Sequence, residues 1–331
     1  MKRFQCSCGA PIFFDNHQCL QCGALVGFDP ESMSVVPMEQ HADLVYCGNH
    51  DHGVCNWLRP SQSDHDLCRA CQFNRTIPNL SLPFNTERWA ALERAKKRLF
   101  YSLYQLSLPM TDGWQASDDG LLFDFLDDVR TQPDTYPNTF ITSGFADGVI
   151  IINLLEADDV ARTAAQIELR ERYRTLLGHF RHESGHYYWS LLSGDEMATS
   201  LFAEVFGDAN ADYRSSLDAY YREGPPADWE QKYISAYASS HPVEDWAETW
   251  SHYLLMHDAL ETAHAHHLID ITPSSGALAE RISQWQAVSV GLNEMNLSLG
   301  REDAYPFVIS PQVHNKLAYV DAMISRFRIL Q

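Results

Sequence analysis

All eight cysteines of this 331-residue chain lie within its first 71 positions, and this bias limits the fold more than any other feature. They form four pairs along the chain, at Cys6 and Cys8, Cys19 and Cys22, Cys47 and Cys55, and Cys68 and Cys71. A segment of this length cannot bury a large apolar core, so its fold depends on cross-links. The sequence therefore predicts a small, cross-linked β module over residues 1–78.

The spacing of the cysteines favours zinc as the cross-link. Closely spaced pairs on turns are typical of zinc sites, because two thiolates from each of two turns complete a tetrahedron. Two structural zinc ions account for all eight cysteines if the first four form one site and the last four another, although a cross-braced pairing stays open. His50 or His52 could replace a thiolate in the second site. We expect a zinc ribbon.

Four disulfides are the alternative, and they require an oxidising compartment. The start of the chain, MKRFQCSCGAP, lacks the apolar core of a secretory signal. No stretch reaches the roughly 18 apolar residues that a membrane span needs. We expect a soluble protein of the cytoplasm, without a membrane segment, in which the cysteines bind metal.

The charge of the chain argues against nucleic acid as a partner. The formal net charge is −20, and the first 80 residues carry only five basic side chains against eight acidic ones. Affinity for nucleic acid comes mainly from Lys and Arg that neutralise phosphates, and neither part of the chain is basic. We expect a structural role for the zinc ribbon, with docking of another protein as its further function.

The rest of the chain is predicted to be mainly helical with a few strands. Residues 74–85 contain two prolines and indicate a linker, and residues 86–108 have apolar side chains at helical spacing. The run GVIIINLL at 148–155 has the length of a buried strand, and residues 158–193 indicate one long helix. These elements predict an α+β fold in which a second domain occupies residues 79–331.

The long predicted helix contains the string His182-Glu183-Ser184-Gly185-His186. Residues four apart lie on one helix face, so His182 and His186 can direct their imidazoles at one metal ion. Glu183 is rotated by about 100° and projects beside the ion, where a carboxylate can act on a water molecule without being a ligand. This geometry suits a catalytic zinc site with Glu183 as general base.

A catalytic zinc site takes a third protein ligand, and the sequence excludes one common source of it. In the extended motif with a third histidine, a glycine and a histidine would follow, but Trp189 and Leu192 occupy those positions. The other source is a carboxylate on a later helix. The segment YASSHPVEDWAETWSHYLLMHD at 237–258 supplies such a helix, with its start predicted at 239–242 and Pro242 in its first turn.

Three polar residues share one face of that later helix, namely Glu244, Glu248 and His252. We predict Glu244 as the third ligand and Glu248 as the acceptor for the second ring N–H of a ligand histidine. His252 is expected to support the ligands or to serve packing, and Asp245 points away by about 100°. A solvated acidic face is the alternative, and the upstream histidine pair argues against it.

Several stretches of the chain, together with the cysteine module, resemble a known family. They are YRTLLGHFRHESGHYYW, FGDANADY, YISAYASSHPVEDWAETWSHYL and YPFV. The chain is similar to the bacterial family described as a zinc ribbon joined to a zinc-binding metallopeptidase, and the likeness covers nearly the whole chain. The resemblance implies a mainly helical, zincin-like peptidase domain after the ribbon.

A more distant likeness concerns residues 237–250. The stretch YASSHPVEDWAETW is similar to the third-ligand helix of the lethal-factor-type gluzincins, which have a tyrosine seven residues before the ligand glutamate and a second glutamate four after it. Those positions are Tyr237, Glu244 and Glu248 here. The resemblance implies that Tyr237 donates a hydrogen bond to the oxyanion of the reaction.

The sequence thus predicts a gluzincin-type peptidase with one catalytic and two structural zinc ions, acting on a peptide or protein. The strand near 149–154 is a candidate edge to which an extended substrate could add by backbone hydrogen bonds, with an ordinary core strand as the alternative. The alternative function is a zinc-stabilised binding or scaffold protein whose HExxH site is catalytically silent.

Overall fold

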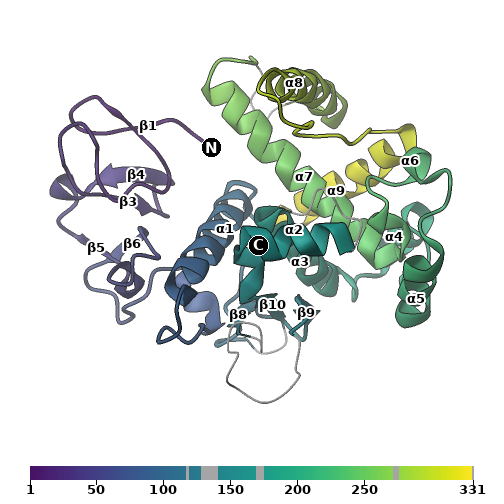
Figure 1. Cartoon of the computed structure of the whole chain (residues 1–331), viewed down its shortest axis with the longest axis horizontal. Helices are drawn as coiled ribbons and strands as arrows, with labels where there is room; N and C mark the ends of the chain where they lie inside the picture. Colours follow the sequence, from purple (N-terminus) through teal and green to yellow (C-terminus); the bar gives the residue numbers. More distant parts are fainter. Residues whose placement is uncertain (117–118, 128–140, 169–174, 271–275, 330–331) are drawn as a thin grey trace. The chain divides into compact units, whose positions relative to one another are not determined.

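The structure is a computed structural model that describes residues 1–116, 119–127, 141–168, 175–270 and 276–329 (Figure 1). The chain divides into two compact units. The sheet unit comprises Arg3–Gln105 and Met110–Phe180, and the helical unit comprises Met1–Lys2, Leu106–Pro109 and Arg181–Gln331. Small β elements precede a mainly helical region, which confirms the predicted α+β class. The domain division at residues 78 and 79 stays a prediction.

Three short antiparallel hairpins begin the sheet unit (Figure 1). Their strands are β1 (Phe4–Gln5), β2 (Pro11–Ile12), β3 (Val26–Asp29), β4 (Ser34–Pro37), β5 (Leu44–Tyr46) and β6 (Leu58–Pro60). Aromatic rings replace a large aliphatic core: the ring of Phe28 lies 4.7 Å from that of Phe14 and 4.8 Å from that of Trp57. Aromatic contacts thus contribute to the core of this region beside the cysteines.

A four-stranded sheet and helix α1 (Asn85–Gln105) form the rest of this unit's core. The strand order is β7 (Asn74–Thr76), β8 (Leu122–Leu126), β10 (Val149–Asn153) and β9 (Gly144–Ala146). Strand β10 is parallel to β8 and antiparallel to β9, and Phe100 of α1 packs 5.8 Å from Phe123 of β8.

One sequence prediction about this sheet is wrong. Residues 74–76 lie in the predicted linker but form β7, which pairs with β8 in parallel. For the strand near 149–154 the sequence left two alternatives open, an edge for an incoming substrate and an ordinary core strand. The structure favours the core strand, because β8 and β9 occupy the two sides of β10.

The predicted single helix over 158–193 is two helices among the described residues. Helix α2 (Asp159–Glu168) follows β10 and a short 3₁₀ turn, and α3 is Leu176–Leu192. Thr175 is not helical, and its Oγ1 accepts the Gly178 N–H at 3.0 Å. This contact satisfies one of the first N–H groups of α3, so Thr175 marks a new helix start within a continuous helical pattern.

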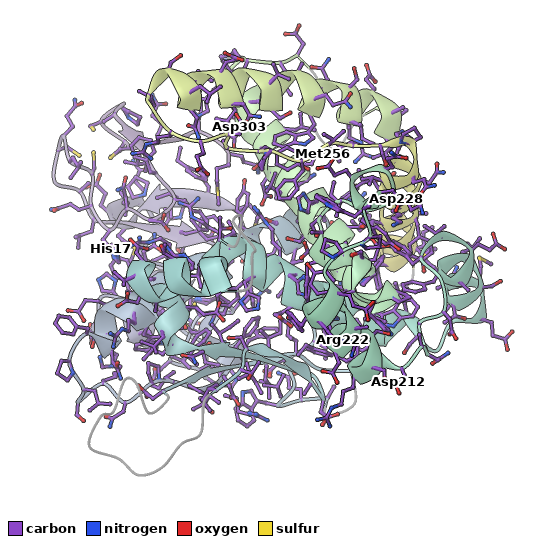
Figure 2. The ribbon with its side chains drawn as sticks, turned by 45° about the vertical axis from the view of Figure 1, so that its right-hand side comes forward. His17, Asp212, Arg222, Asp228, Met256 and Asp303 are labelled. Atoms are coloured by element: carbon purple, nitrogen blue, oxygen red, sulfur yellow. The ribbon has the colours of Figure 1, made fainter. Side chains whose placement is uncertain are left out.

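The helical unit contains most of α3 and six further helices in the described residues. They are α4 (Glu196–Val205), α5 (Tyr213–Glu223), α6 (Trp229–Lys232), α7 (Pro242–Ala265), α8 (Leu278–Ser298) and α9 (Pro311–Ile329). Helix α7 packs against both α8 and α9 (Figure 1). Asp212 and Arg222, labelled in Figure 2, locate the two ends of α5.

Helix α7 begins at Pro242, as the sequence predicted. The residue before it, His241, is the N-cap, and its Nδ1 accepts the Val243 N–H at 3.1 Å. Proline suits the first turn because its missing N–H would have no helical partner there. The buried face of α7 carries Trp246 and Trp250, both fully buried, which gives this helix its place in the core.

Candidate metal centre and catalytic site

Helices α3 and α7 approach closely at Gly185, and this contact positions the site. A Cβ atom on Gly185 would lie 2.9 Å from the Cα of Ala247 and 3.2 Å from Cδ1 of Trp250. Trp246 Nε1 donates to the Gly185 carbonyl at 2.8 Å, and Trp250 Nε1 donates to Ser184 Oγ at 3.0 Å. The two residues inside the HExxH string therefore set the spacing of the helices.

This close approach brings three donor groups together. His182 Nε2 lies 3.1 Å from His186 Nε2 and 3.1 Å from Glu244 Oε2, and His186 Nε2 lies 3.4 Å from Glu244 Oε1. A tetrahedral zinc site with Zn–N and Zn–O bonds of about 2.05 Å has ligand-to-ligand edges of about 3.3 Å. The three observed separations fit a metal ion of this size.

The hydrogen bonds around His182 supply an independent test of that fit. Its Nδ1 lies 2.7 Å from Glu248 Oε1, and Ser235 Oγ donates to the other oxygen of Glu248 at 2.6 Å. Because a carboxylate only accepts, Nδ1 carries a proton, so Nε2, which lies toward Glu244, is the ring atom that would bind a metal once it has given up its own proton. Glu244 Oε2 is buried and has no hydrogen-bond partner among the described residues. A cation between these atoms satisfies both.

The ionisation of these groups reflects the same crowding. Burial alone would lower the pKa of His182, but Glu244 and Glu248 raise it well above its usual value. Burial would raise the pKa of both carboxyls; His186 and His182 nevertheless hold the pKa of Glu244 well below its usual value, and His182 lowers that of Glu248 to about 2. Both carboxylates are therefore charged at neutral pH and suited to a cationic site.

Glu183 is 4% exposed and follows His182 on α3. Its carboxylate lies near enough to Tyr213 to contribute, after burial and Glu244, to a pKa of Tyr213 that is raised above the usual phenol value. Tyr213 was missed by the sequence analysis. Its hydroxyl donates to Glu244 Oε1 at 2.7 Å, although the residue comes from α5, 31 positions earlier in the chain. The sequence analysis made no use of Tyr213 beyond the stretch FGDANADY, which ends in it.

Tyr237 and His252 have different neighbours around this cluster. The Tyr237 ring centroid is 6.0 Å from that of His182 and 5.8 Å from that of Tyr220. His252 Nδ1 lies 2.9 Å from the Tyr305 hydroxyl, and burial lowers the pKa of His252 to about 4. His252 thus lies within a buried aromatic contact, and the donor group found at the site consists of His182, His186 and Glu244.

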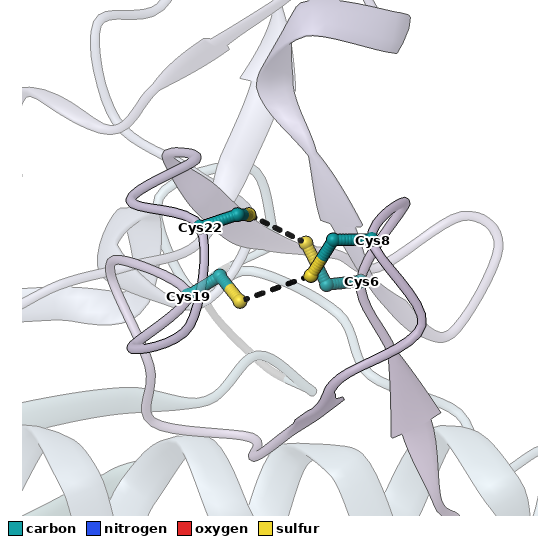
Figure 3. Close-up of side chains that lie close together, drawn as sticks. All are labelled: Cys6, Cys8, Cys19 and Cys22. Atoms are coloured by element: carbon teal, nitrogen blue, oxygen red, sulfur yellow. Dashed lines mark hydrogen bonds between the residues drawn. The ribbon is translucent and has the colours of Figure 1, made fainter.

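The cysteines form two clusters in the order of the sequence. The first cluster contains Cys6, Cys8, Cys19 and Cys22 (Figure 3). The sulfurs of Cys6 and Cys22 are 3.7 Å apart and those of Cys8 and Cys19 are 3.8 Å apart. A tetrahedral zinc–thiolate site with bonds of about 2.3 Å has edges of about 3.8 Å, whereas a disulfide would need about 2.0 Å. The spacing fits zinc.

The turn after the second pair of cysteines shows why a short sequence makes such a site. Gly23 adopts a φ of 77° directly after Cys22, and its N–H donates to the Cys19 carbonyl at 2.9 Å. Glycine adopts this left-handed conformation without strain, so both thiolates can project from one tight turn. Cys8 and Cys22 are exposed, so this cluster lies at the surface of its unit.

The second cluster contains Cys47, Cys55, Cys68 and Cys71, all of them buried. The sulfurs of Cys55 and Cys68 are 3.7 Å apart. Lys97 of α1 is 4% exposed and donates from Nζ to the Val54 carbonyl at 3.0 Å. Burial would lower the pKa of Lys97, but Cys55 and other charged neighbours raise it, so the ammonium offsets the negative charge of the thiolates.

The remaining alternatives for the cysteines are resolved by these contacts. All eight cysteines are described and none forms a disulfide. His50 Nδ1 lies 3.0 Å from the Cys55 carbonyl, and the His52 ring packs near Trp89, so neither ring joins the described thiolate cluster. The cross-braced pairing is excluded because each cluster takes four cysteines that follow one another in sequence.

Two models of known protein families match this chain. A family model described as "Putative zinc-binding metallo-peptidase" matches residues 85–323. The chain belongs to this family. A model described as "zinc-ribbon domain" matches residues 3–82, which confirms the predicted order of a zinc ribbon before a metallopeptidase region. Family membership thus supports a zinc metallohydrolase that acts on peptides or proteins.

Relatives occur in mycobacteria. An uncharacterised protein of Mycobacterium bovis and another of Mycobacterium tuberculosis are each 38% identical over 333 residues, which cover 98% of this chain and 95% of theirs. No solved structure matches the chain. None of the helices in the described residues is both long and apolar enough to cross a lipid bilayer.

Proposed function

We propose that the chain is a gluzincin-type zinc peptidase in which His182, His186 and Glu244 hold the catalytic zinc. The observation that carries the proposal is the convergence of two Nε2 atoms and one carboxylate within 3.1 to 3.4 Å. It is supported by the contact of Glu248 with Nδ1 of His182, which leaves Nε2 available as a donor to a metal. Zinc, when bound at such a site, polarises the substrate carbonyl and lowers the pKa of water.

Glu183 moves the proton in this mechanism. Its carboxylate accepts a proton as the water oxygen attacks the carbonyl carbon of the scissile amide. The resulting carboxylic acid then donates that proton to the amide nitrogen as the C–N bond breaks, so Glu183 ends in its starting charge state. Its burial on α3 holds the carboxylate next to His182 and limits competition from bulk water.

Tyr237 is the proposed donor to the oxyanion of the tetrahedral intermediate. Its ring lies next to that of His182, which supports a position beside the reacting carbonyl. Removal of a hydrogen-bond donor of this type raises the activation barrier by about 3–4 kcal/mol in other enzymes. Replacement of Tyr237 by Phe should therefore lower kcat while the zinc content of the protein stays unchanged.

The proposal is tested by digesting a broad peptide library with the full chain. We expect cleavage that a chelator abolishes and added zinc restores. Glu183→Gln should lower kcat by about 10²- to 10⁴-fold because it removes the proton acceptor. Its zinc content should remain at about three ions per chain, one for each donor cluster. Glu204→Gln, an exposed carboxylate on α4, is the matched control.

Two results would count against peptidase activity at this site. Turnover by Glu183→Gln at the rate of the unmodified chain would remove Glu183 from the mechanism. A fully zinc-loaded chain that cleaves no member of the library would favour the alternative, a zinc-stabilised binding or scaffold protein. Docking through the zinc ribbon and a cytoplasmic location stay predictions under either function.

A further inference from the structure

Tyr213 contacts the donor cluster, although neither the HExxH string nor the α7 pattern indicated it. It begins α5, and its hydroxyl donates to Glu244 Oε1 at 2.7 Å. The residue is 46% exposed, whereas Glu244 is 1% exposed. An otherwise accessible phenol therefore reaches a buried carboxylate.

Two caps fix the position of Tyr213 relative to α7. Asp212 accepts the Ser215 N–H at 2.9 Å and begins α5, whose ends can be followed in Figure 2 from Asp212 and Arg222. His241, the N-cap of α7, donates from Nε2 to the Ala211 carbonyl at 3.0 Å. The His241 side chain thus ties the start of α7 to the start of α5, and the Tyr213 ring packs edge-on against the same imidazole, with the ring centroids 5.1 Å apart.

The hydrogen bond from Tyr213 makes the two oxygens of Glu244 inequivalent. Oε1 accepts the phenol and lies 3.4 Å from His186 Nε2, while Oε2 is buried, lies 3.1 Å from His182 Nε2 and has no hydrogen-bond partner in the described part of the chain. We propose that Tyr213 is a positioning residue that holds Glu244 by Oε1 and so presents Oε2 to a zinc ion shared with the two histidines. This inference rests on the proposed function.

Tyr213 has the same relation to the ligand Glu244 as Glu248 has to the ligand His182. Glu248 accepts from His182 Nδ1 at 2.7 Å and orients a ring, and Tyr213 donates to Glu244 and orients a carboxylate. Partners of this kind fix the orientation of metal ligands, and their loss costs about 10- to 100-fold in metal affinity. Tyr213 therefore acts through Glu244, in contrast to the role proposed for Tyr237.

The test compares Tyr213→Phe with Tyr221→Phe, an exposed tyrosine on the same helix. The full chain is treated with a mild chelator until one zinc per chain has left, and zinc is then titrated back against a competing indicator. We expect Tyr213→Phe to bind this zinc about 10- to 100-fold more weakly and Tyr221→Phe to bind it within about twofold of the unmodified chain.

Cobalt on the same emptied site gives a second readout that a general loss of stability would not produce. Phe at position 213 frees Oε1, so the visible absorption of the cobalt derivative should change in intensity for Tyr213→Phe and remain unchanged for Tyr221→Phe. The midpoint of thermal unfolding before zinc is added measures separately the loss of stability that Tyr213→Phe causes by removing a donor from the buried Glu244 carboxylate.

The results distinguish a failure of the positioning role of Tyr213 from a failure of the proposed zinc site. Zinc affinity within about twofold of normal in Tyr213→Phe, with an unchanged cobalt spectrum, would overturn the positioning role. His186→Ala is the companion variant. If the third zinc still binds to His186→Ala with normal affinity, the proposed donor set itself is wrong, whatever Tyr213→Phe shows.

Discussion

The buried cysteine cluster and the histidine–glutamate cluster are built in opposite ways. Cys47, Cys55, Cys68 and Cys71 all come from one segment of 25 residues and offer four donors with no exposed sulfur. The other cluster draws its three donors from two helices, with 57 residues between His186 and Glu244. Its imidazole rings remain partly accessible, at 11% and 13% side-chain exposure.

The difference is the one expected between a structural zinc site and the proposed catalytic zinc site. Four thiolates complete a tetrahedron and leave no coordination position, so zinc there contributes to folding. Three donors leave a position for water or substrate, which is what a hydrolase requires. If the two clusters differ in this way, loss of a cysteine should affect the fold and loss of the third zinc should affect activity.

Loss of one thiolate from the buried cluster should damage the fold most. Cys68→Ser leaves buried charge around Lys97 without its full counterpart, and we expect a loss of about 3–5 kcal/mol in the free energy of unfolding. Cys8→Ser is the control, because Cys8 is exposed and water can replace its sulfur. Denaturant unfolding of both variants measures the difference. Equal losses would show that burial does not distinguish the two cysteine clusters.

A mild chelator should remove zinc from the three clusters one after another. The three-donor site should release its zinc first, because it has fewer ligands and partly accessible rings. Peptide cleavage should disappear when about one zinc per chain has been lost, while the far-ultraviolet circular dichroism stays unchanged. If activity persisted until the fold itself was lost, the site of the reaction would have to be sought elsewhere.

Gly185→Ala should weaken the histidine–glutamate cluster and leave the cysteine clusters intact. Alanine favours a helix by about 1 kcal/mol over glycine, but its Cβ would lie 2.9 Å from the Ala247 backbone. Forcing α3 and α7 apart should cost about 1–3 kcal/mol and weaken zinc binding at the third site. Gly194→Ala, whose Cβ would meet nothing within 4 Å, is the matched control. A more stable Gly185→Ala with normal zinc affinity would contradict the proposed role of this contact.

The smallest effect concerns pH and α7. Acid releases zinc from every donor cluster, and this release itself lowers the stability of the protein. The effect of His257 on stability is therefore measured in protein from which the zinc has been removed. Burial lowers the pKa of His257 below its usual 6.5, so the unfolded chain binds more protons and stability falls as the pH drops below about 6.5. His257→Gln should reduce this slope by less than about 1.4 kcal/mol per pH unit. In chelated protein, unfolding from pH 7 to 5.5 should show this reduction and His266→Gln, an exposed control, should not.

Local features of the fold and site were predictable from sequence, and features that depend on distant contacts were not. The close pairs of cysteines follow from turns such as that at Gly23, which need only neighbouring residues, whereas the grouping of the pairs into two clusters stayed open until the structure was known. The start of α7 at Pro242 was predictable for the same reason. The break at Thr175 was missed because one side-chain cap ends a pattern that is helical on both sides. Tyr213 was missed because its contact with Glu244 exists only once two helix starts have been tied together through His241.

The proposed catalytic zinc binds between His182, His186 and Glu244. Anomalous diffraction at the zinc edge, from crystals of the full chain, tests it directly. We predict three peaks, two within the cysteine clusters and one about 2.0–2.2 Å from Nε2 of both histidines and from Oε2 of Glu244. A zinc-loaded crystal with no peak at these atoms, or with a third peak next to other side chains, would show that these three residues do not bind the zinc.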